Sequence, residues 1–351
     1  MKAAVIYGRK DVRIEEVAEP KVSKGKVKIK VAWAGICGSD LHAYHHGLGV
    51  AYEEHPISKR KVPLILGHEF AGVVTEVGEG VTNVSVGDKV AVEPNLYCGE
   101  CTYCKRGDYH ICSLSNAGFL GLADDGGFAE YVVADAKHFH KLPEKMSLEE
   151  GALVEPTAVC YHAVKKSGLT VGDTVAIFGA GPIGQLLLLC ANAAGAAKTF
   201  VIDVSEERLA KAKELGATEV INPAKENVEE KIFSMAAEGV DVAFEAAGAQ
   251  PTFTSALNVL KKQGMLMVVA GFATDITFNP NMQLFKETNI SFSLAYANEF
   301  PIVIDLIAEG KLDVKKVVTK KIKLDNLVED GLELLSVDKS QSKILVQTSN
   351  E

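Results

Sequence analysis

The sequence predicts an α/β protein with two domains, one rich in β-strands and one built on a doubly wound parallel sheet. Its length of 351 residues corresponds to about two domains at roughly 150 residues each. Short, Val-rich apolar runs broken by Gly, Pro, Asn and Asp fill the first 150 residues, as is typical of antiparallel sheets. After residue 150, strand patterns alternate with helix patterns, which favours a parallel sheet with helices on both faces.

The first domain takes its expected strands from apolar runs that end in turn residues. These runs are 26–35, 70–78, 88–94 and 128–135. After them, a helix that opens at Ser147 as its N-cap and ends at Gly168 leads into the second domain.

The second domain is expected to follow the β–α alternation. Its predicted strands are 174–179, 199–204, 219–223, 240–248 and 265–272. Its predicted helices are 182–195, 205–215, 227–238 and 251–263. Strand patterns at 320–325 and 342–347 then flank a helix near 325–335, and we expect this last segment to rejoin the first domain. The predicted domains are 1–152 with 297–351, and 153–296.

The composition excludes several classes of function. A net charge of -9 offers no broad attraction to nucleic acid or to an anionic membrane. The longest apolar stretch, 185–197, is shorter than the roughly 20 residues of a membrane span, and the N-terminus lacks the features of a signal peptide. We therefore expect a cytoplasmic protein whose seven cysteines are ligands, catalytic groups or core residues rather than disulfides.

A glycine-rich turn follows the first strand of the second domain. Gly179, Gly181 and Gly184 have the G-x-G-x-x-G spacing at the start of a helix pattern. The first glycine permits a tight turn, the second lets a pyrophosphate approach the backbone, and the helix N-terminus offers unpaired N–H groups. The candidate dinucleotide-binding residues of this turn are Gly179, Gly181, Pro182, Ile183 and Gly184.

An acidic residue closes the second strand of this domain. Asp203 can hydrogen-bond the ribose hydroxyls of an adenosine and repels a 2′-phosphate, so NAD is favoured over NADP. The alternative role for Asp203 is to cap the following helix, a task that Ser205 can also perform. Arg208 is a candidate for contact with the adenine, against the alternative of a solvated helix arginine.

Four cysteines lie within fifteen residues of the first domain. Cys98, Cys101, Cys104 and Cys112 have a C-x-x-C-x-x-C-x7-C spacing that can surround one ion tetrahedrally. A closed shell of four thiolates leaves no position for substrate, so the spacing predicts a structural zinc site. An iron–sulfur cluster is the competing interpretation, although the spacing differs from common ferredoxin patterns.

A second candidate metal site is spread along the first domain. Cys37 lies in a small-residue turn, and His68 with Glu69 follows a glycine at the end of an apolar stretch. Glu155 precedes a proline in an apolar helix start, where a buried carboxylate is costly unless it is paired or ligating. A thiolate, an imidazole and a carboxylate from Glu69 or Glu155 would leave one position open for water or substrate. The alternatives are a core cysteine, a satisfied histidine and a surface or capping glutamate.

Together these motifs resemble the zinc-dependent medium-chain dehydrogenases, and the resemblance covers essentially the whole chain. They stand in the expected order: GICGSDLH, LGHEFAGVVTEVGEGVTNVSVGDKVAVEP, the four-cysteine segment, GGFAEYVV, LVEPTAVCYHAV and VAIFGAGPIGQ. Within this family, the segment EPTAV, which contains Glu155, is similar to the corresponding segment of the polyol and butanediol dehydrogenases. The segments closest to 2,3-butanediol (acetoin) dehydrogenases are HPISKRKVPLILGHE, GFLGLADDGGFAEYVV and FNPNMQLFKETNISFSLAY.

The resemblance implies a β-rich GroES-like catalytic domain and a Rossmann domain that binds NAD. It implies two zinc ions per subunit, a catalytic one on Cys37, His68 and Glu69 and a structural one on the four cysteines, with Glu155 near the catalytic ion directly or through water. The implied reaction is oxidation of a secondary alcohol, namely 2,3-butanediol to acetoin, and the reverse reduction of acetoin or diacetyl. The implied assembly is a homodimer or homotetramer that pairs through the edge strand 290–296.

The residues after Cys37 carry an implied proton relay. Ser39 is expected within reach of the reacting oxygen and His42 near the cofactor ribose, so that a Ser39–ribose–His42 chain leads to solvent. Asp40 is expected to hold the imidazole of His68, and both Ser39 and Asp40 can cap a helix as well. His45 and His46 have no partner motif and are expected at the lip of the site or on the surface.

Two kinds of alternative remain. The substrate can be another secondary alcohol, either a polyol such as sorbitol or the hydroxyl of threonine. A protein of a different class, held together by zinc and binding NAD without turnover, has the same nucleotide and four-cysteine motifs. The segment 43–54 departs from similar enzymes, which carry an acidic residue and a proline-containing turn there, and this departure concerns substrate fit rather than chemistry.

Overall fold

The computed structural model describes residues 1–115 and 118–349, and the chain divides into two compact units. Unit 1 comprises Met1–Glu155, Ala297–Gly310 and Val318–Glu351. Unit 2 comprises Pro156–Tyr296 and Lys311–Val317, and the sequence-based prediction assigns the second of these segments to the first domain through the range 297–351. The predicted fold class, a β-rich part and a doubly wound parallel sheet, is confirmed by the sheets of the two units. Among the described residues, no helix has the length and hydropathy that a membrane crossing requires.

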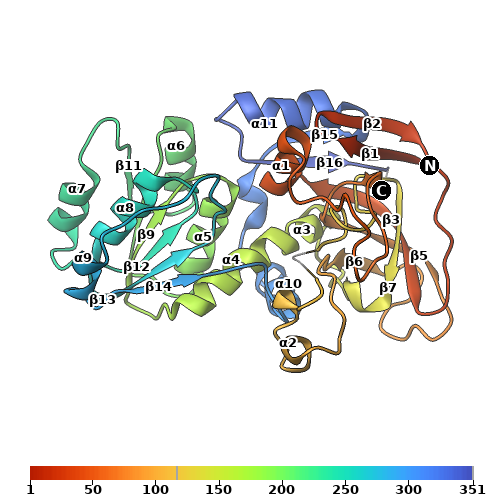
Figure 1. The fold of residues 1–351 in the computed structure, drawn as a ribbon, viewed down its shortest axis with the longest axis horizontal. Helices are drawn as coiled ribbons and strands as arrows, with labels where there is room; N and C mark the ends of the chain where they lie inside the picture. The colour runs from red at the N-terminus through yellow and green to blue at the C-terminus, as the bar shows by residue number, and fades with distance from the viewer. Residues whose placement is uncertain (116–117, 350–351) are drawn as a thin grey trace. The chain divides into compact units, whose positions relative to one another are not determined.

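Unit 1 is built on a seven-stranded sheet (Figure 1). The strand order is β15-β16-β3-β5-β6-β8, with β7 paired to β3, and all pairs are antiparallel except β15 with β16. These strands are β3 (Lys26–Gly35), β5 (Glu69–Val77), β6 (Lys89–Val92), β7 (Tyr131–Asp135), β8 (Phe139–Lys141), β15 (Val318–Lys323) and β16 (Lys343–Gln347). A smaller sheet has the order β2-β1-β4, from β1 (Lys2–Gly8), β2 (Asp11–Glu16) and β4 (Leu64–Ile65).

The C-terminal segment rejoins unit 1, as the sequence predicts. β16 pairs with β3, with Leu345 opposite Gly35, so the last strand lies next to the one that leads to Cys37. The helix expected near 325–335 is instead a 3₁₀ turn at Leu324–Asn326, a π-helix at Leu327–Glu333 and the short α11 (Leu334–Val337).

The helices of unit 1 are short and serve mainly as connections. They are α1 (Gly38–His46), α2 (Thr102–Lys105), α3 (Leu148–Ala152), α10 (Phe300–Ala308) and α11, with 3₁₀ turns at Tyr109–Ile111 and Ala136–His138. Ser147 caps α3 as predicted, because its hydroxyl accepts from the Glu150 amide while the Glu150 carboxylate accepts from the Ser147 amide at 2.8 Å.

The single helix predicted from Ser147 to Gly168 is wrong, because the chain breaks it at Leu153. The second piece is α4 (Val154–Ser167). Pro156 explains the break, since it has no N–H to donate to the preceding turn and restricts the residue before it. In the first turn of α4 the proline is tolerated, because those amides have no helical acceptor.

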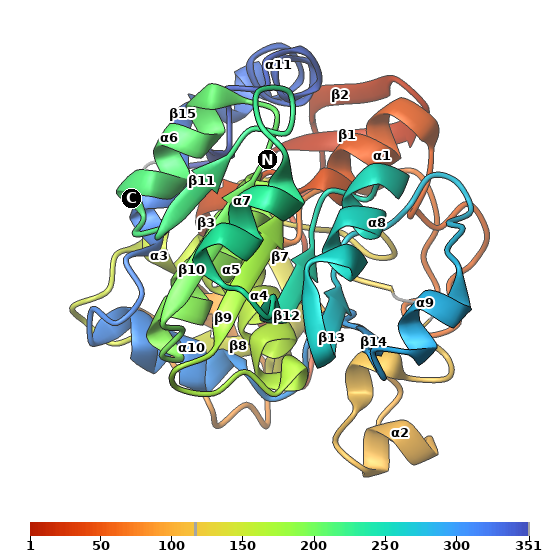
Figure 2. The ribbon, with the colours of Figure 1, turned by 90° about the vertical axis from the view of Figure 1, so that its left-hand side faces the viewer.

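Unit 2 contains a six-stranded sheet in which all pairs are parallel, in the order β11-β10-β9-β12-β13-β14 (Figure 2). Its strands are β9 (Thr174–Phe178), β10 (Lys198–Ile202), β11 (Glu219–Ile221), β12 (Val240–Glu245), β13 (Leu260–Val268) and β14 (Asn289–Phe292). Its helices are α5 (Pro182–Ala193), α6 (Glu206–Glu214), α7 (Val228–Met235), α8 (Gln250–Asn258) and α9 (Pro280–Leu284), besides most of α4.

One helix end in unit 2 is also predicted wrongly. The predicted helix 251–263 ends at Asn258, and Leu260 already pairs with Val240 at the start of β13. The apolar Leu260 followed by two lysines is typical of a last helical turn, so the local pattern favoured a helix. Pairing with β12 and burial of Leu260 to 1% exposure override that preference.

Candidate active site

The four cysteines of unit 1 converge on one point. Their sulfur atoms lie 3.5 Å apart for Cys98 and Cys112 and for Cys101 and Cys104, and 3.9 Å apart for Cys98 and Cys104 and for Cys101 and Cys112. Four thiolates around one ion with Zn–S bonds of about 2.3 Å have sulfurs about 3.8 Å apart. The donor set therefore fits a single tetrahedral ion, and the sulfurs are too close together for the larger iron–sulfur cluster.

Backbone amides donate hydrogen bonds to the sulfur atoms of this cluster. The amides of Glu100 and Cys101 donate to the Cys98 sulfur at 3.5 and 3.4 Å, and the Cys98 amide donates to the Cys112 sulfur at 3.4 Å. Backbone hydrogen bonds from Cys104 and Ser113 lower the pKa of Cys101 to about 5. Since thiolates are the form that binds metal, these amides favour the ligating state of Cys98 and Cys101, whereas burial raises the pKa of Cys104 to about 12.

A second cluster forms where two segments of unit 1 meet. Cys37 follows β3 as the N-cap of α1, while His68 and Glu69 stand at the start of β5. One ligand atom from each of these three residues lies within 4.8 Å of the others. His68 and Glu69 are buried, at 4% and 0% exposure, and a thiolate, an imidazole and a carboxylate form a donor set that suits zinc with a position left open.

Strand register explains how the carboxylate reaches this cluster. In the β3–β5 pair Gly35 stands opposite Glu69, and the side chain of Glu69 lies across the glycine. A Cβ atom at Gly35 would lie 2.1 Å from Glu69 Oε2, so a larger residue would displace the carboxylate. The Glu69 carboxylate therefore requires a glycine at position 35, which explains the small residue before Cys37.

Asp40 supports both the helix and the imidazole. Its Oδ2 accepts from the Cys37 amide at 2.9 Å, which forms part of the capping of α1. Its Oδ1 lies 3.6 Å from His68 Nδ1, and neither of these two buried atoms has another hydrogen-bond partner in the described chain. Burial lowers the pKa of His68, but the charges of Asp40 and Cys37 outweigh it and raise this pKa well above its usual value. Asp40 thus orients the ring so that Nε2 points away from it, as a ligand would require.

A buried lysine that the sequence analysis missed completes this cluster. Lys343 of β16 donates to both carboxylate oxygens of Glu69 at 2.7 Å and to the Ile36 carbonyl at 3.0 Å, and its side chain is 2% exposed. Burial lowers the pKa of Lys343, but Glu69, Cys37 and Glu155 together raise it above its usual value. The only local signal is a lysine at the start of the strand pattern SKILVQ, which does not indicate burial.

Glu155, the other candidate carboxylate ligand, lies outside the group that contains Glu69. It is buried at 5% exposure and acts electrostatically on Lys343, but it is not a member of the three-residue ligand group found in the described chain. The sequence left open which of the two glutamates would ligate a metal. The geometry brings Glu69 into the group while Lys343 holds both of its oxygens, so ligation by either glutamate stays a prediction.

The predicted relay residues lie on α1. Ser39 Oγ is 3.3 Å from His68 Nε2, which places the hydroxyl beside the cluster. His42 is exposed one turn further along the helix. His46 is exposed as well, whereas His45 is partly buried and forms a hydrogen bond with Ser336 Oγ at 2.5 Å.

The glycine turn of unit 2 has the tight geometry that a dinucleotide site needs. Gly179 has a φ of +104°, and a Cβ atom at Gly184 would lie 1.7 Å from the Gly179 carbonyl oxygen. Gly181 is the N-cap of α5, and Pro182 and Ile183 form the first turn of that helix. The turn therefore leads directly into a helix N-terminus, whose unpaired N–H groups favour binding of a pyrophosphate.

Asp203 lies at this turn and does not cap α6. Its Oδ2 accepts from the Ala180 amide at 2.7 Å and its Oδ1 from the Ser205 amide at 2.9 Å. Ser205 is the N-cap, with its hydroxyl accepting from the Arg208 amide at 3.3 Å. Arg208 reaches back toward the turn, since its Nη1 is 3.9 Å from the Cβ position of Gly181.

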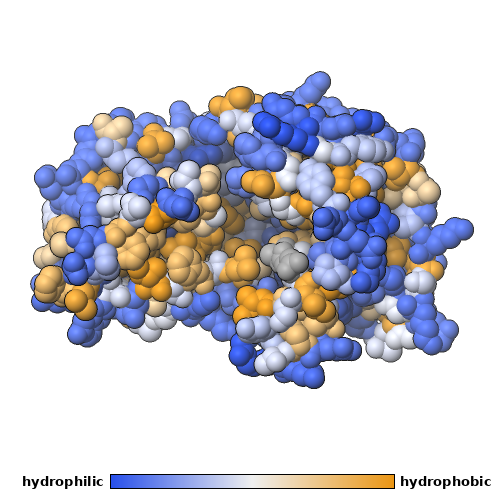
Figure 3. Space-filling view, in the orientation of Figure 1, coloured by the Kyte–Doolittle hydropathy of each residue, from blue (hydrophilic) through white to orange (hydrophobic). Residues whose placement is uncertain are grey.

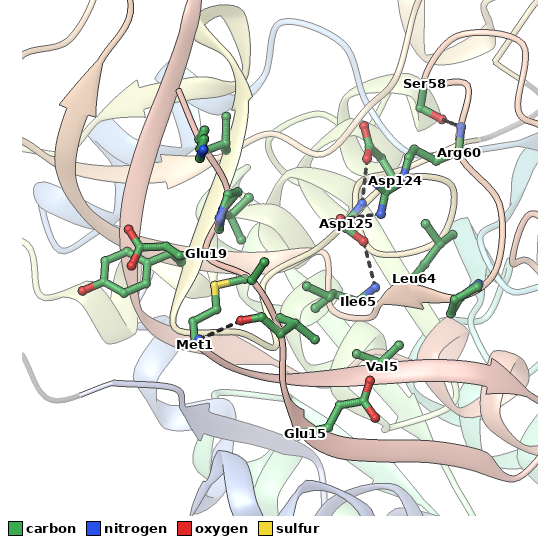
Figure 4. Close-up of a pocket in the computed structure, with 18 of the residues that line it drawn as sticks. Met1, Val5, Glu15, Glu19, Ser58, Arg60, Leu64, Ile65, Asp124 and Asp125 are labelled. Atoms are coloured by element: carbon green, nitrogen blue, oxygen red, sulfur yellow. Dashed lines mark hydrogen bonds and ion pairs between the residues drawn. The ribbon is translucent and has the colours of Figure 1, made fainter. Parts of the chain in front are cut away.

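A separate pocket of about 660 Å³ lies in unit 1 (Figure 4). Its walls carry Glu15, Glu19 and Asp124, and Arg60 pairs with Asp125 at 2.7 Å. Burial raises the pKa of Asp124. None of the predicted site residues lines this pocket, so the candidate active site is defined by the second cluster rather than by this cavity.

Comparisons with known proteins cover both units. Residues 23–144 match the family described as alcohol dehydrogenase GroES-like domain, and residues 182–309 match the family described as zinc-binding dehydrogenase. The chain is 44% identical to the (R,R)-butanediol dehydrogenase of Bacillus subtilis (strain 168), with 99% of each chain covered. It is 37% identical to a sorbitol dehydrogenase of the same organism, with 95% of this chain and 93% of the relative covered.

Solved structures agree with these sequence matches. The crystal structure of 2R,3R-butanediol dehydrogenase from Bacillus subtilis has a TM-score of 0.94 and 43% identity, with 99% of each chain covered. An Escherichia coli CFT073 dehydrogenase complexed with NADH has a TM-score of 0.89 and 32% identity, again with 99% of each chain covered.

Proposed function

This chain belongs to the zinc-binding medium-chain alcohol dehydrogenase family, and we propose that it oxidises 2,3-butanediol to acetoin with NAD and catalyses the reverse reduction of acetoin or diacetyl. The observation that carries the proposal is the cluster of the half-buried Cys37 with the buried His68 and Glu69, beside the Ser39 hydroxyl. Full-length similarity to a protein named (R,R)-butanediol dehydrogenase supports the choice of a vicinal diol.

Each residue of the cluster has a defined task in this proposal. A zinc ion on Cys37, His68 and a glutamate would supply a positive charge that lowers the pKa of the substrate hydroxyl, as it lowers that of water from 15.7 to about 7. Ser39 then accepts the hydroxyl proton and passes it toward His42, which is exposed and can release it to solvent. Asp40 keeps the His68 ring oriented throughout.

The cofactor choice follows from Asp203. When bound, NAD accepts the hydride in the oxidation and NADH donates it in the reduction. The amides of Ala180 and Ser205 hold the Asp203 carboxylate at the glycine turn. A negative charge fixed there repels a 2′-phosphate. We therefore expect NAD to be preferred over NADP by at least tenfold in kcat/KM, roughly 1.4 kcal/mol of discrimination.

The proposed assembly is a homodimer or homotetramer that uses the edge of the unit 2 sheet. β14 is one edge strand of this sheet and ends in the exposed Phe292, and further exposed apolar side chains follow it and occupy α9. Figure 3 shows apolar residues gathered over this part of unit 2. They include Phe292, Leu294, Met282, Leu284 and Phe285, whose side chains are about half exposed or more. An exposed apolar edge strand favours pairing with a second copy.

A substrate screen tests the proposed reaction. Initial rates with NAD are measured on (R,R)-, (S,S)- and meso-2,3-butanediol, sorbitol and threonine, and with NADH on acetoin and diacetyl, using Cys37→Ser as the matched inactive control. We expect the highest kcat/KM on a butanediol isomer and on acetoin. Activity confined to sorbitol or threonine, or no activity on any vicinal diol or acetoin, would contradict the proposal.

A further inference from the structure

The exposed face of α1 carries two histidines one helical turn apart. His42 and His46 are both exposed, and their ring centres are 6.2 Å apart with the ring planes at 35°. Residues at i and i+4 are neighbours on one helix face, and two histidines at this spacing form a known chelating arrangement for zinc. Neutral imidazole is a preferred ligand of Zn²⁺, Cu²⁺ and Ni²⁺.

The helix that carries this pair is held at both ends. Asp40 caps its N-terminus, and Gly47 ends it in the left-handed conformation with its amide donating to the Ala43 carbonyl at 3.0 Å. Tyr44 is buried and donates to the Glu333 carboxylate at 2.7 Å. Because the backbone under the two histidines is fixed, little ordering is needed before a metal binds.

The geometry suits chelation after a small side-chain movement. Two imidazoles bound tetrahedrally with Zn–N bonds of about 2.0–2.1 Å have ring centres about 5 Å apart. The observed 6.2 Å must therefore shrink by about 1 Å, which rotation about the side-chain bonds of exposed residues provides. His45 is not available in the same way, because its Nε2 is engaged by Ser336.

We propose that His42 and His46 form a third metal site, distinct from both clusters, that takes Zn²⁺ or another divalent ion with a preference for imidazole. An ion bound there occupies the His42 nitrogen lone pair that proton transfer needs. Excess metal therefore slows turnover, and this second part of the proposal rests on the proposed function.

The test is a Zn²⁺ titration of the zinc-loaded enzyme. Equilibrium dialysis with elemental analysis measures zinc bound beyond the two expected ions, and turnover is measured in parallel over the same zinc range. Loss of one ligand from a two-ligand site weakens binding by about 10²- to 10⁴-fold. We expect His46→Ala to reduce the affinity for the third zinc by this factor and to remove the inhibition, with unchanged activity at low zinc. His45→Ala is the matched control and should bind and respond as the unmodified protein does.

Each outcome separates the parts of the proposal. A third zinc that binds equally well to His46→Ala overturns the site. A third zinc that depends on His46 but leaves turnover unchanged supports the site and overturns the regulatory role. Binding that depends on His46 in a protein without dehydrogenase activity on any tested alcohol supports the site and contradicts the proposed function instead.

Discussion

The two thiol-containing clusters of unit 1 are built in opposite ways. The closed cluster takes all four ligands from one segment, Cys98 to Cys112, and local backbone amides hold its sulfurs. The open cluster takes Cys37 from the turn between β3 and α1, His68 and Glu69 from the start of β5, and Lys343 from β16 near the C-terminus. The first depends on its own loop, whereas the second depends on the register of three strands.

The sharpest test of this contrast is Cys37→Ser. The open cluster loses its thiolate, and metal-assisted charge stabilisation is worth several kcal/mol, so kcat/KM should fall by at least about 10³-fold. The closed cluster should be unaffected, and the thermal unfolding temperature should change by only a few degrees. Steady-state kinetics and a melting curve on the same sample check both statements, and a variant that keeps a tenth of the activity would break the account of the open cluster.

The reciprocal change is Cys101→Ser in the closed cluster. Structural zinc contributes to folding directly, and losing several kcal/mol should lower the unfolding temperature by about 10 °C. Activity at 25 °C should fall by less than tenfold, because the open cluster does not share this loop. Cys190→Ser, a buried cysteine of α5 outside both clusters, is the control for a simple loss of a thiol. Equal loss of activity in Cys101→Ser and Cys37→Ser would remove the distinction between the clusters.

Lys343→Met tests the long-range contact of the open cluster. The change leaves the buried Glu69 carboxylate unpaired, which should destabilise the metal-free protein by about 3 kcal/mol. Lys343→Arg retains the positive charge and should therefore destabilise the metal-free protein by less. Thermal unfolding of the metal-free variants measures the effect, and the double variant Glu69→Gln with Lys343→Met should recover part of the loss. If the double variant is as unstable as the sum of the single changes, the pair is not coupled.

The smallest expected effects come from two glycines. Gly35→Ala places a Cβ atom against the Glu69 carboxylate and should reduce kcat/KM by about tenfold, or roughly 1.4 kcal/mol. Gly99→Ala in the closed cluster meets no atom within 4 Å but has a φ of +76°, so it should cost about 1 kcal/mol of stability without changing kcat/KM. The reverse pattern in kinetics and melting curves would show that the strand register does not position Glu69.

The contrast also explains what the sequence could predict. The four cysteines could be assigned to one ion because their spacing is local. The glycine turn with Asp203 could be placed because it follows a strand and opens a helix. Cys37, His68 and Glu69 could be grouped through the order of motifs along the chain, since no single motif contains all three.

The missed features share a long-range cause. Lys343 lies 274 residues from Glu69 along the chain, and only the pairing of β16 with β3 brings it to the cluster. The end of α8 was misplaced because pairing of Leu260 with Val240 outweighs a local helix pattern. The break between α3 and α4 had a local signal in Pro156, which an apolar helix pattern on both sides concealed.

The central claim is that unit 1 holds two independent metal sites, one structural and one catalytic. Zinc content per chain, measured together with activity on 2,3-butanediol, tests it most directly. Without added zinc, when the site proposed on α1 is empty, the account predicts two zinc ions in the unmodified chain, one in an inactive Cys37→Ser variant and one in an active Cys101→Ser variant. A single zinc per chain that is lost only when a cysteine of the closed cluster is changed would contradict the account, and would favour a zinc-stabilised nucleotide-binding protein without turnover.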